Sequence, residues 1–254
     1  MSPTTMTPRQ RIHTALEHNE PDRVPTALGG GPYGMVDDLY LRMIRYLDLG
    51  SPVPPFRQGH SISYMDDRLL EALGTDIRYC WPALMPNSPV TPGKDKDTFY
   101  DSYNQEWKRA LPYYYAGKGL LVDTDRVEDI DRLVSWPDTE GSHWMAGVAD
   151  RARQLHEQDR YFVTMRMVAS HGPFQTACDL RGTENFLMDM VLNTEFAETL
   201  LDRATDVVTG LLTSARQTAG QYFDMIELPG DDYAVNTRTI ISLTMFNKFI
   251  KPRI

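Results

Sequence analysis

The sequence contains few cysteines, and their small number excludes one class of protein. Cys80 and Cys178 are the two cysteines in 254 residues, too few for the disulfide framework of a small secreted domain. They do not form a Cys-x-x-Cys pair, so we expect two buried, inert thiols. Reduced thiols of this kind are typical of the cytoplasm, which is the compartment that we predict.

Positive charge and long apolar stretches are also scarce. The chain has 26 lysines and arginines against 35 aspartates and glutamates, a formal net charge of −9. A nucleic-acid-binding surface needs an excess of lysine and arginine, because these side chains neutralise the phosphate backbone. The sequence has no apolar run of the roughly 18 residues that cross a bilayer, and its first residues lack the apolar stretch of a signal peptide. We therefore expect a globular protein with neither a nucleic-acid nor a membrane partner.

Helix and strand signals alternate along the chain. Thr7, Pro8 and Gln10 have the spacing of a capping box and predict a helix that ends before Asn19. The longest expected helix begins near Thr194, where apolar residues mark one face for six turns and Gly220 closes it. Further helices are expected at 36–47, 66–73, 125–133, 142–157, 185–190 and 243–250, and strands at 24–28, 76–81, 161–168 and 222–228. This alternation predicts an α/β protein with a parallel sheet.

One long segment does not fit the alternation. Residues 85–120 contain several prolines followed by three consecutive tyrosines. The segment is too long for a plain connection. We therefore expect a lid or an excursion that contains short strands.

Three segments resemble the uroporphyrinogen decarboxylase superfamily. Residues 9–25 read RQRIHTALEHNEPDRVP, residues 172–189 read GPFQTACDLRGTENFLMD, and residues 230–252 read GDDYAVNTRTIISLTMFNKFIKP. The resemblance implies a TIM-like (β/α)8 barrel with its cleft at the carboxyl ends of the strands. It also implies a single domain over 1–254 that lacks the last part of the barrel. The four strands counted above are about half of a barrel and cannot close one, so we interpret the chain as a fragment.

The superfamily includes two chemistries. Its decarboxylases remove carboxyl groups from a tetrapyrrole in haem synthesis and carry an Arg-Gln-Ala-Gly-Arg motif after the first strand. Here residues 28–33 read LGGGPY instead, without a cation. Its methyltransferases transfer a methyl group from a corrinoid protein to a thiol, using zinc held by a His-x-Cys pair and a later cysteine. The segment LRGTENFLMD and the Gly-Asp-Asp loop are more similar to this second branch.

We therefore expect methyl transfer from a corrinoid to a thiol acceptor. A decarboxylase acting on uroporphyrinogen is the alternative, and a non-catalytic remnant that binds a partner subunit is a third interpretation. The zinc ligands would lie beyond Ile254, so no cofactor is expected within this chain, and zinc only in an intact methyltransferase. The expected partners are a small-molecule substrate and a corrinoid protein, and a homodimer is left open.

Candidate catalytic residues follow two predicted strands. Asp231 and Asp232 come after the fourth strand, where TIM-barrel enzymes carry their catalytic groups; the alternative is a solvated turn with a capping aspartate. His171 follows the third strand and is a candidate acid, base or ligand; the alternative is a histidine that caps a helix. Candidate substrate-binding residues are Arg166, Glu227, Tyr233 and Gly30. For Arg166, an internal salt bridge is an equal alternative to neutralising a substrate carboxylate.

Overall fold

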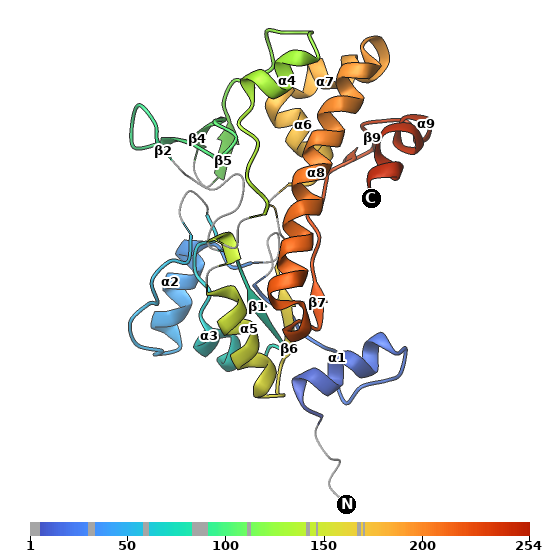
Figure 1. Ribbon diagram of the computed structural model, residues 1–254. Coiled ribbons are helices and arrows are strands. Elements are labelled where there is room, and N and C mark those ends of the chain that lie inside the picture. Colours follow the sequence, from blue (N-terminus) through green and yellow to red (C-terminus); the bar gives the residue numbers. More distant parts are fainter. Residues whose placement is uncertain are drawn as a thin grey trace, which may run out of the picture. The chain divides into compact units, whose positions relative to one another are not determined.

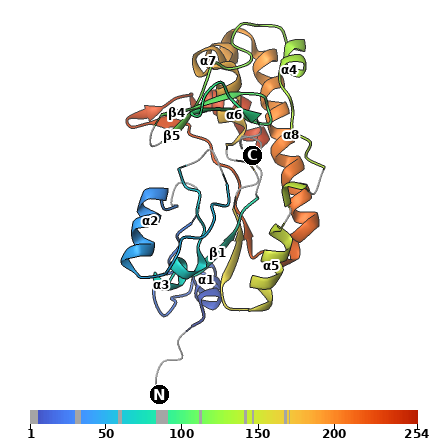
Figure 2. The same cartoon turned by 90° about the vertical axis from the view of Figure 1, so that its left-hand side faces the viewer.

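The computed structural model describes residues 6–29, 34–57, 61–82, 91–110, 113–140, 143–145, 147–166, 169 and 171–254. These residues form two compact units (Figures 1 and 2). The first unit is drawn from residues 1–84, 142–167 and 215–227, and the second from 85–141, 168–214 and 228–254. The expected site residue Gly30 lies outside the described residues.

The first unit is built on a parallel sheet. Its strands are β1 (Ile77–Cys80), β6 (Phe162–Met165) and β7 (Met225–Ile226), in the order β1-β6-β7. Met165 pairs with both Cys80 and Ile226, so the carboxyl ends of the three strands lie side by side. Helix α5 (Val148–Glu157) packs on β1 and β6. The unit also contains α1 (Pro8–Leu16), α2 (Asp37–Tyr46), α3 (Asp67–Ala72) and the 3-10 helices His143–Met145 and Gly220–Tyr222.

Helix α1 confirms the capping box. The side chain of Thr7 accepts a hydrogen bond from the amide of Gln10, and the Gln10 side chain accepts one from the amide of Thr7. Two donors that a helix start leaves free are therefore satisfied reciprocally.

The strand expected at 24–28 is absent from the structure. The amide of Thr26 donates to the Asp76 side chain at 2.8 Å. The carbonyl of Thr26 accepts a hydrogen bond from the amide of Asp76. The fully buried carboxylate of Asp76 also pairs with Arg11 at 2.5 Å and with Arg23 at 2.8 Å. A buried charge must be paired and hydrogen-bonded, and here the backbone of the apolar segment supplies one of the donors.

The second unit combines an antiparallel sheet with helices. Strands β2 (Thr91–Pro92), β3 (Thr98–Tyr100), β4 (Glu106–Ala110) and β5 (Tyr113–Ala116) form a meander, which confirms the expected short strands of this segment. The helices are α4 (Glu128–Leu133), α6 (Pro173–Arg181), α7 (Thr183–Leu192), α9 (Leu243–Met245) with its continuation Phe246–Arg253, and most of α8 (Thr194–Ala219). A short hairpin joins β8 (Ala234–Val235) to β9 (Arg238–Thr239).

Helix α8 follows the predicted periodicity. Its apolar face is buried at Leu200, Leu201, Ala204, Val207, Leu211 and Ala215. Residues 194–214 belong to the second unit and 215–219 to the first.

The structure differs from the expected elements in two further places. The fourth strand, expected at 222–228, is reduced to Met225–Ile226, because residues 220–222 form a 3-10 turn. Helix α6 was not expected at all. The described residues thus form a mixed α/β structure with three parallel strands, and no barrel closes within this part of the chain. None of the described helices is both long and apolar enough to cross a membrane.

Candidate functional site

The amino end of α6 is capped by a side chain from a distant loop. Oδ2 of Asp231 accepts a hydrogen bond from the amide of Phe174 at 3.1 Å, and Oδ1 accepts one from the amide of Gln175 at 2.8 Å. The amide of Gly172 donates to the carbonyl of Gly230 at 3.0 Å. A carboxylate is favoured there by the free amides and by the positive end of the helix dipole. The capping role of Asp231 is thus explained by local helix chemistry.

His171 lies two residues before the first residue of this helix and is held by Asp179. Its Nδ1 is 2.9 Å from Oδ2 of Asp179, while Nε2 of Gln175 donates to the other oxygen at 2.9 Å. Gln175 and Asp179 are one turn apart on α6, so the helix places both against the histidine. With both oxygens of Asp179 engaged, the imidazole is held at Nδ1, and Nε2 makes no hydrogen bond to any residue that the structure describes.

Acidic neighbours change the proton affinity of His171. Burial by itself lowers the pKa of the imidazole, but the hydrogen bond to Asp179 and the charges of Asp179, Asp231 and Asp101 outweigh it, so the net effect is a raised pKa. The ring of Trp107 lies 5.9 Å from the imidazole, centroid to centroid. About a third of the His171 side chain is exposed (34%). The histidine is therefore accessible and has an increased affinity for a proton.

Tyr233 completes the group around Asp231. Its hydroxyl donates to Oδ2 of Asp231 at 2.9 Å, and its ring packs against Phe174 and Phe246. Burial and the charge of Asp231 raise the pKa of the Tyr233 hydroxyl. Tyr233 consequently remains a hydrogen-bond donor at neutral pH.

Asp101 is a part of this region that the sequence analysis missed. Its buried carboxylate accepts hydrogen bonds from Nε1 of Trp107 at 2.6 Å and from the amides of Tyr103 and Gln105 at 2.9 Å. Burial raises the pKa of Asp101 to about 6. An aspartate followed three residues later by an asparagine is typical of a tight turn, and this pattern could have indicated Asp101. In the structure Asn104 adopts a positive φ of 65° within that turn.

Arg166 and Glu227 form a separate site in the first unit. Arg166 follows the last residue of β6 and Glu227 follows the last residue of β7. Nη1 of Arg166 lies 2.7 Å from Oε1 of Glu227. The structure therefore has the internal salt bridge that was one of the two alternatives for Arg166.

The expected catalytic and substrate residues are distributed unequally. The second unit brings together His171, Asp231 and Tyr233. Asp232 is exposed, and its side chain makes no hydrogen bond or ion pair with any residue that the structure describes. Arg166 and Glu227 belong to the first unit.

The described residues do not fit a zinc ion. Within this part of the chain, no group of three or more histidine, cysteine, aspartate or glutamate side chains could hold a metal. Cys80 and Cys178 are buried free thiols, and burial raises the pKa of each to about 12. A zinc ligand must be a thiolate, and burial disfavours that form at both cysteines; the expectation that the two thiols are buried is confirmed.

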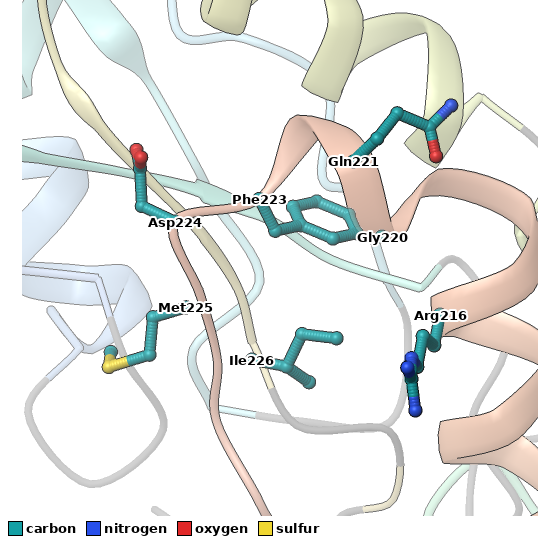
Figure 3. Close-up of a pocket in the computed structure, with 7 residues that line it drawn as sticks. All are labelled: Arg216, Gly220, Gln221, Phe223, Asp224, Met225 and Ile226. Carbon is teal, nitrogen blue, oxygen red and sulfur yellow. The ribbon is translucent and has the colours of Figure 1, made fainter.

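A cavity is lined by residues of β7, of the turn before it and of the last part of α8 (Figure 3). Its volume is about 350 Å³, and it is lined by Arg216, Gly220, Gln221 and residues 223–226. Asp224, one of the lining residues, is held by Arg9 at 2.7 Å and by the amide of Val163 at 2.8 Å. The cavity contains none of the site residues expected from the sequence.

Comparisons with known proteins give one structural likeness. No protein-family model matches the chain, and no curated protein matches it. A solved structure that it resembles is a methyltransferase from Methanosarcina mazei, with a TM-score of 0.53 and 16% sequence identity. The match covers 98% of this chain and 65% of the methyltransferase, so the chain spans less than two thirds of that protein. At this identity the likeness shows the fold.

Proposed function

We propose that the chain is part of a methyltransferase with a TIM-like barrel, which transfers a methyl group from a corrinoid to a thiol acceptor. The pairing of His171 with Asp179 carries this proposal, because it places an accessible base with a raised pKa at the start of α6. The structural likeness to a methyltransferase supports the fold, and residues 172–189 and 230–252 support the branch of the superfamily. The methyl donor would be a corrinoid protein.

The proposed reaction assigns His171 a proton-transfer role. In the reaction the S–H bond of the acceptor breaks, an S–C bond forms, and the methyl–cobalt bond breaks with its electron pair remaining on the corrinoid. The thiol proton goes to Nε2 of His171, while Nδ1 donates to Asp179. Asp179 thereby stabilises the imidazolium that forms, and Tyr233 and Asp231 hold the first turn of α6 in position. General-base catalysis of this kind contributes about 10² to 10⁴ in rate.

Zinc has no step in this assignment, because the described residues do not provide a site for it. Zinc in the intact methyltransferase remains an implication of the family resemblance. Its chemistry would be to stabilise the acceptor as a thiolate.

The test is an assay of S-methylation. The 254-residue chain is incubated with methylcobalamin and 2-mercaptoethanesulfonate, and the methylated thiol is quantified by mass spectrometry. We expect product with the wild type and a loss of about 100-fold or more in His171→Gln. His18→Gln is the matched control, because His18 is exposed at the end of α1, and it should retain full activity.

Two outcomes contradict the proposal. If uroporphyrinogen is decarboxylated and no thiol is methylated, the decarboxylase interpretation replaces it. If neither reaction occurs, the non-catalytic interpretation replaces the proposal.

The proton affinity of His171 can be measured separately by NMR titration of its imidazole. Asp179→Asn removes the charge that contributes most to raising the pKa, so the His171 pKa should fall. Asp206→Asn, at an exposed position on α8, should leave it unchanged. An unchanged His171 pKa in Asp179→Asn would exclude Asp179 as the positioning residue.

A further inference from the structure

Two buried arginines approach the same tryptophan in the first unit. The guanidinium carbon of Arg57 lies 4.6 Å from the centroid of the Trp81 ring, and that of Arg166 lies 5.4 Å from it. Arg57 is 8% exposed, Arg166 2% and Trp81 7%. Phe56 adds a second ring, 5.1 Å from the guanidinium of Arg57 and 4.9 Å from Trp81, centroid to centroid. Two positive charges are thus concentrated in an aromatic, poorly hydrated environment.

Carboxylates lie near both arginines, and the charge of Arg166 still acts on Arg57. Glu227 binds Arg166 at 2.7 Å. The pKa of Arg57 is lowered to about 9, first by burial and then by the charge of Arg166, and the opposing effect of Asp37 is smaller. Asp37 is itself engaged, since its Oδ1 accepts a hydrogen bond from the amide of Ser63 at 2.6 Å. The site is therefore one in which a further negative charge would be stabilised.

The same tryptophan also carries a buried donor. Nε1 of Trp81 has no hydrogen-bond partner among the residues that the structure describes. A buried N–H group without a partner costs free energy, and an oxygen atom from a ligand would satisfy it. This observation is independent of the charges on the two arginines.

We propose that Arg57, Arg166 and Trp81 form a binding site for the oxyanion group of a small molecule, such as a carboxylate, sulfonate or phosphate. The planar guanidinium group presents paired N–H donors that match such groups, and it binds them well where water is excluded. Glu227 competes with the ligand for Arg166. The proposal concerns the first unit alone and does not depend on methyl transfer.

The binding test uses inorganic sulfate as the probe. Isothermal titration calorimetry and thermal unfolding are performed with the 254-residue chain at constant ionic strength, with sodium chloride as the balancing salt. We expect saturable sulfate binding and an increase of Tm with sulfate concentration, because a ligand that binds the folded state stabilises it. Dimethyl sulfone has a similar shape but no charge and should not bind. Equal binding of dimethyl sulfone, or no sulfate binding, would overturn the proposal.

Variants identify the residues that bind sulfate. Arg57→Gln and Arg166→Gln should each weaken binding about tenfold or more, whereas Arg153→Gln, at an exposed position on α5 that pairs with Asp150, should not. Arg57→Lys retains the positive charge and serves as the test if Arg57→Gln does not fold. Lysine lacks the paired N–H donors of the guanidinium group, so this variant should also bind sulfate more weakly. Sulfate affinity unchanged in Arg57→Lys and in Arg57→Gln would place the anion elsewhere.

Glu227→Gln gives a result that a purely structural salt bridge does not predict. Removing the competing carboxylate leaves Arg166 available to the anion, so sulfate should bind more tightly than to the wild type. Weaker binding in this variant, with Tm measured to confirm folding, would show that Arg166 serves Glu227 alone.

Discussion

The carboxylate of Asp231 occupies the space that a side chain at Gly172 would fill. A Cβ atom on Gly172 would lie 2.7 Å from Oδ1 of Asp231 and nearer still to Oδ2. The backbone of Gly172 is extended, with a φ of −73°, so any residue could adopt it. Glycine is therefore required at this position by the close approach of the cap.

Gly172→Ala should consequently destabilise the protein through the cap alone. We expect a decrease of about 1 to 3 kcal/mol in the free energy of unfolding, the usual cost of overpacking, measured by urea denaturation. Gly230→Ala is the control, since a Cβ there would meet no heavy atom within 4 Å. Equal stability of the two alanine variants would contradict the assignment.

The two adjacent aspartates of the loop should differ in their contributions to stability. Asp231→Ala removes the acceptor of two α6 amides and of the Tyr233 hydroxyl, and loss of a cap costs about 0.5 to 2 kcal/mol. Asp232→Ala changes an exposed side chain and should stay within about 0.5 kcal/mol of the wild type. Thermal unfolding of both variants measures the difference. A larger effect at Asp232 would show that Asp231 is not the residue that caps α6.

Local signals in the sequence were sufficient where the stabilising partners are neighbours in the chain. The capping box of α1 and the apolar face of α8 depend on residues a few positions apart, and both are confirmed. The segment 24–28 was misassigned because the acceptor of the Thr26 amide is Asp76, fifty residues away. No periodicity in an apolar stretch reveals such a partner.

Helix α6 was missed for a related reason. Gly172 and Pro173 are acceptable start signals, and Phe174, Ala177 and Cys178 have helical spacing and are buried. The capping side chain, however, comes from residue 231, so the usual N-cap residue is absent from the local sequence. His171 and Asp231 were correctly singled out, but their neighbours Asp179 and Asp101 are brought near only by α6 and by the antiparallel sheet.

The raised pKa of Asp101 predicts a particular dependence of stability on pH. The carboxyl group has a pKa of about 6 in the folded protein, against an ordinary value of 3.8, so the folded state binds more protons than the unfolded state between these values. Its contribution to stability is therefore complete below about pH 4 and is lost as the pH rises through 6. A shift of this size corresponds to roughly 3 kcal/mol.

Asp101→Asn isolates this effect, because asparagine does not titrate. The amide nitrogen of asparagine cannot accept the hydrogen bond from Trp107, so the variant is less stable at every pH, and the informative quantity is how the difference changes. The stability of the wild type minus that of Asp101→Asn should fall by about 3 kcal/mol between pH 4 and pH 7 in urea denaturation. The corresponding difference for Asp206→Asn, at an exposed position, should stay nearly constant. A difference for Asp101 that is flat or rises with pH would mean that the buried carboxylate is ionised throughout, held by Trp107 and the two backbone amides.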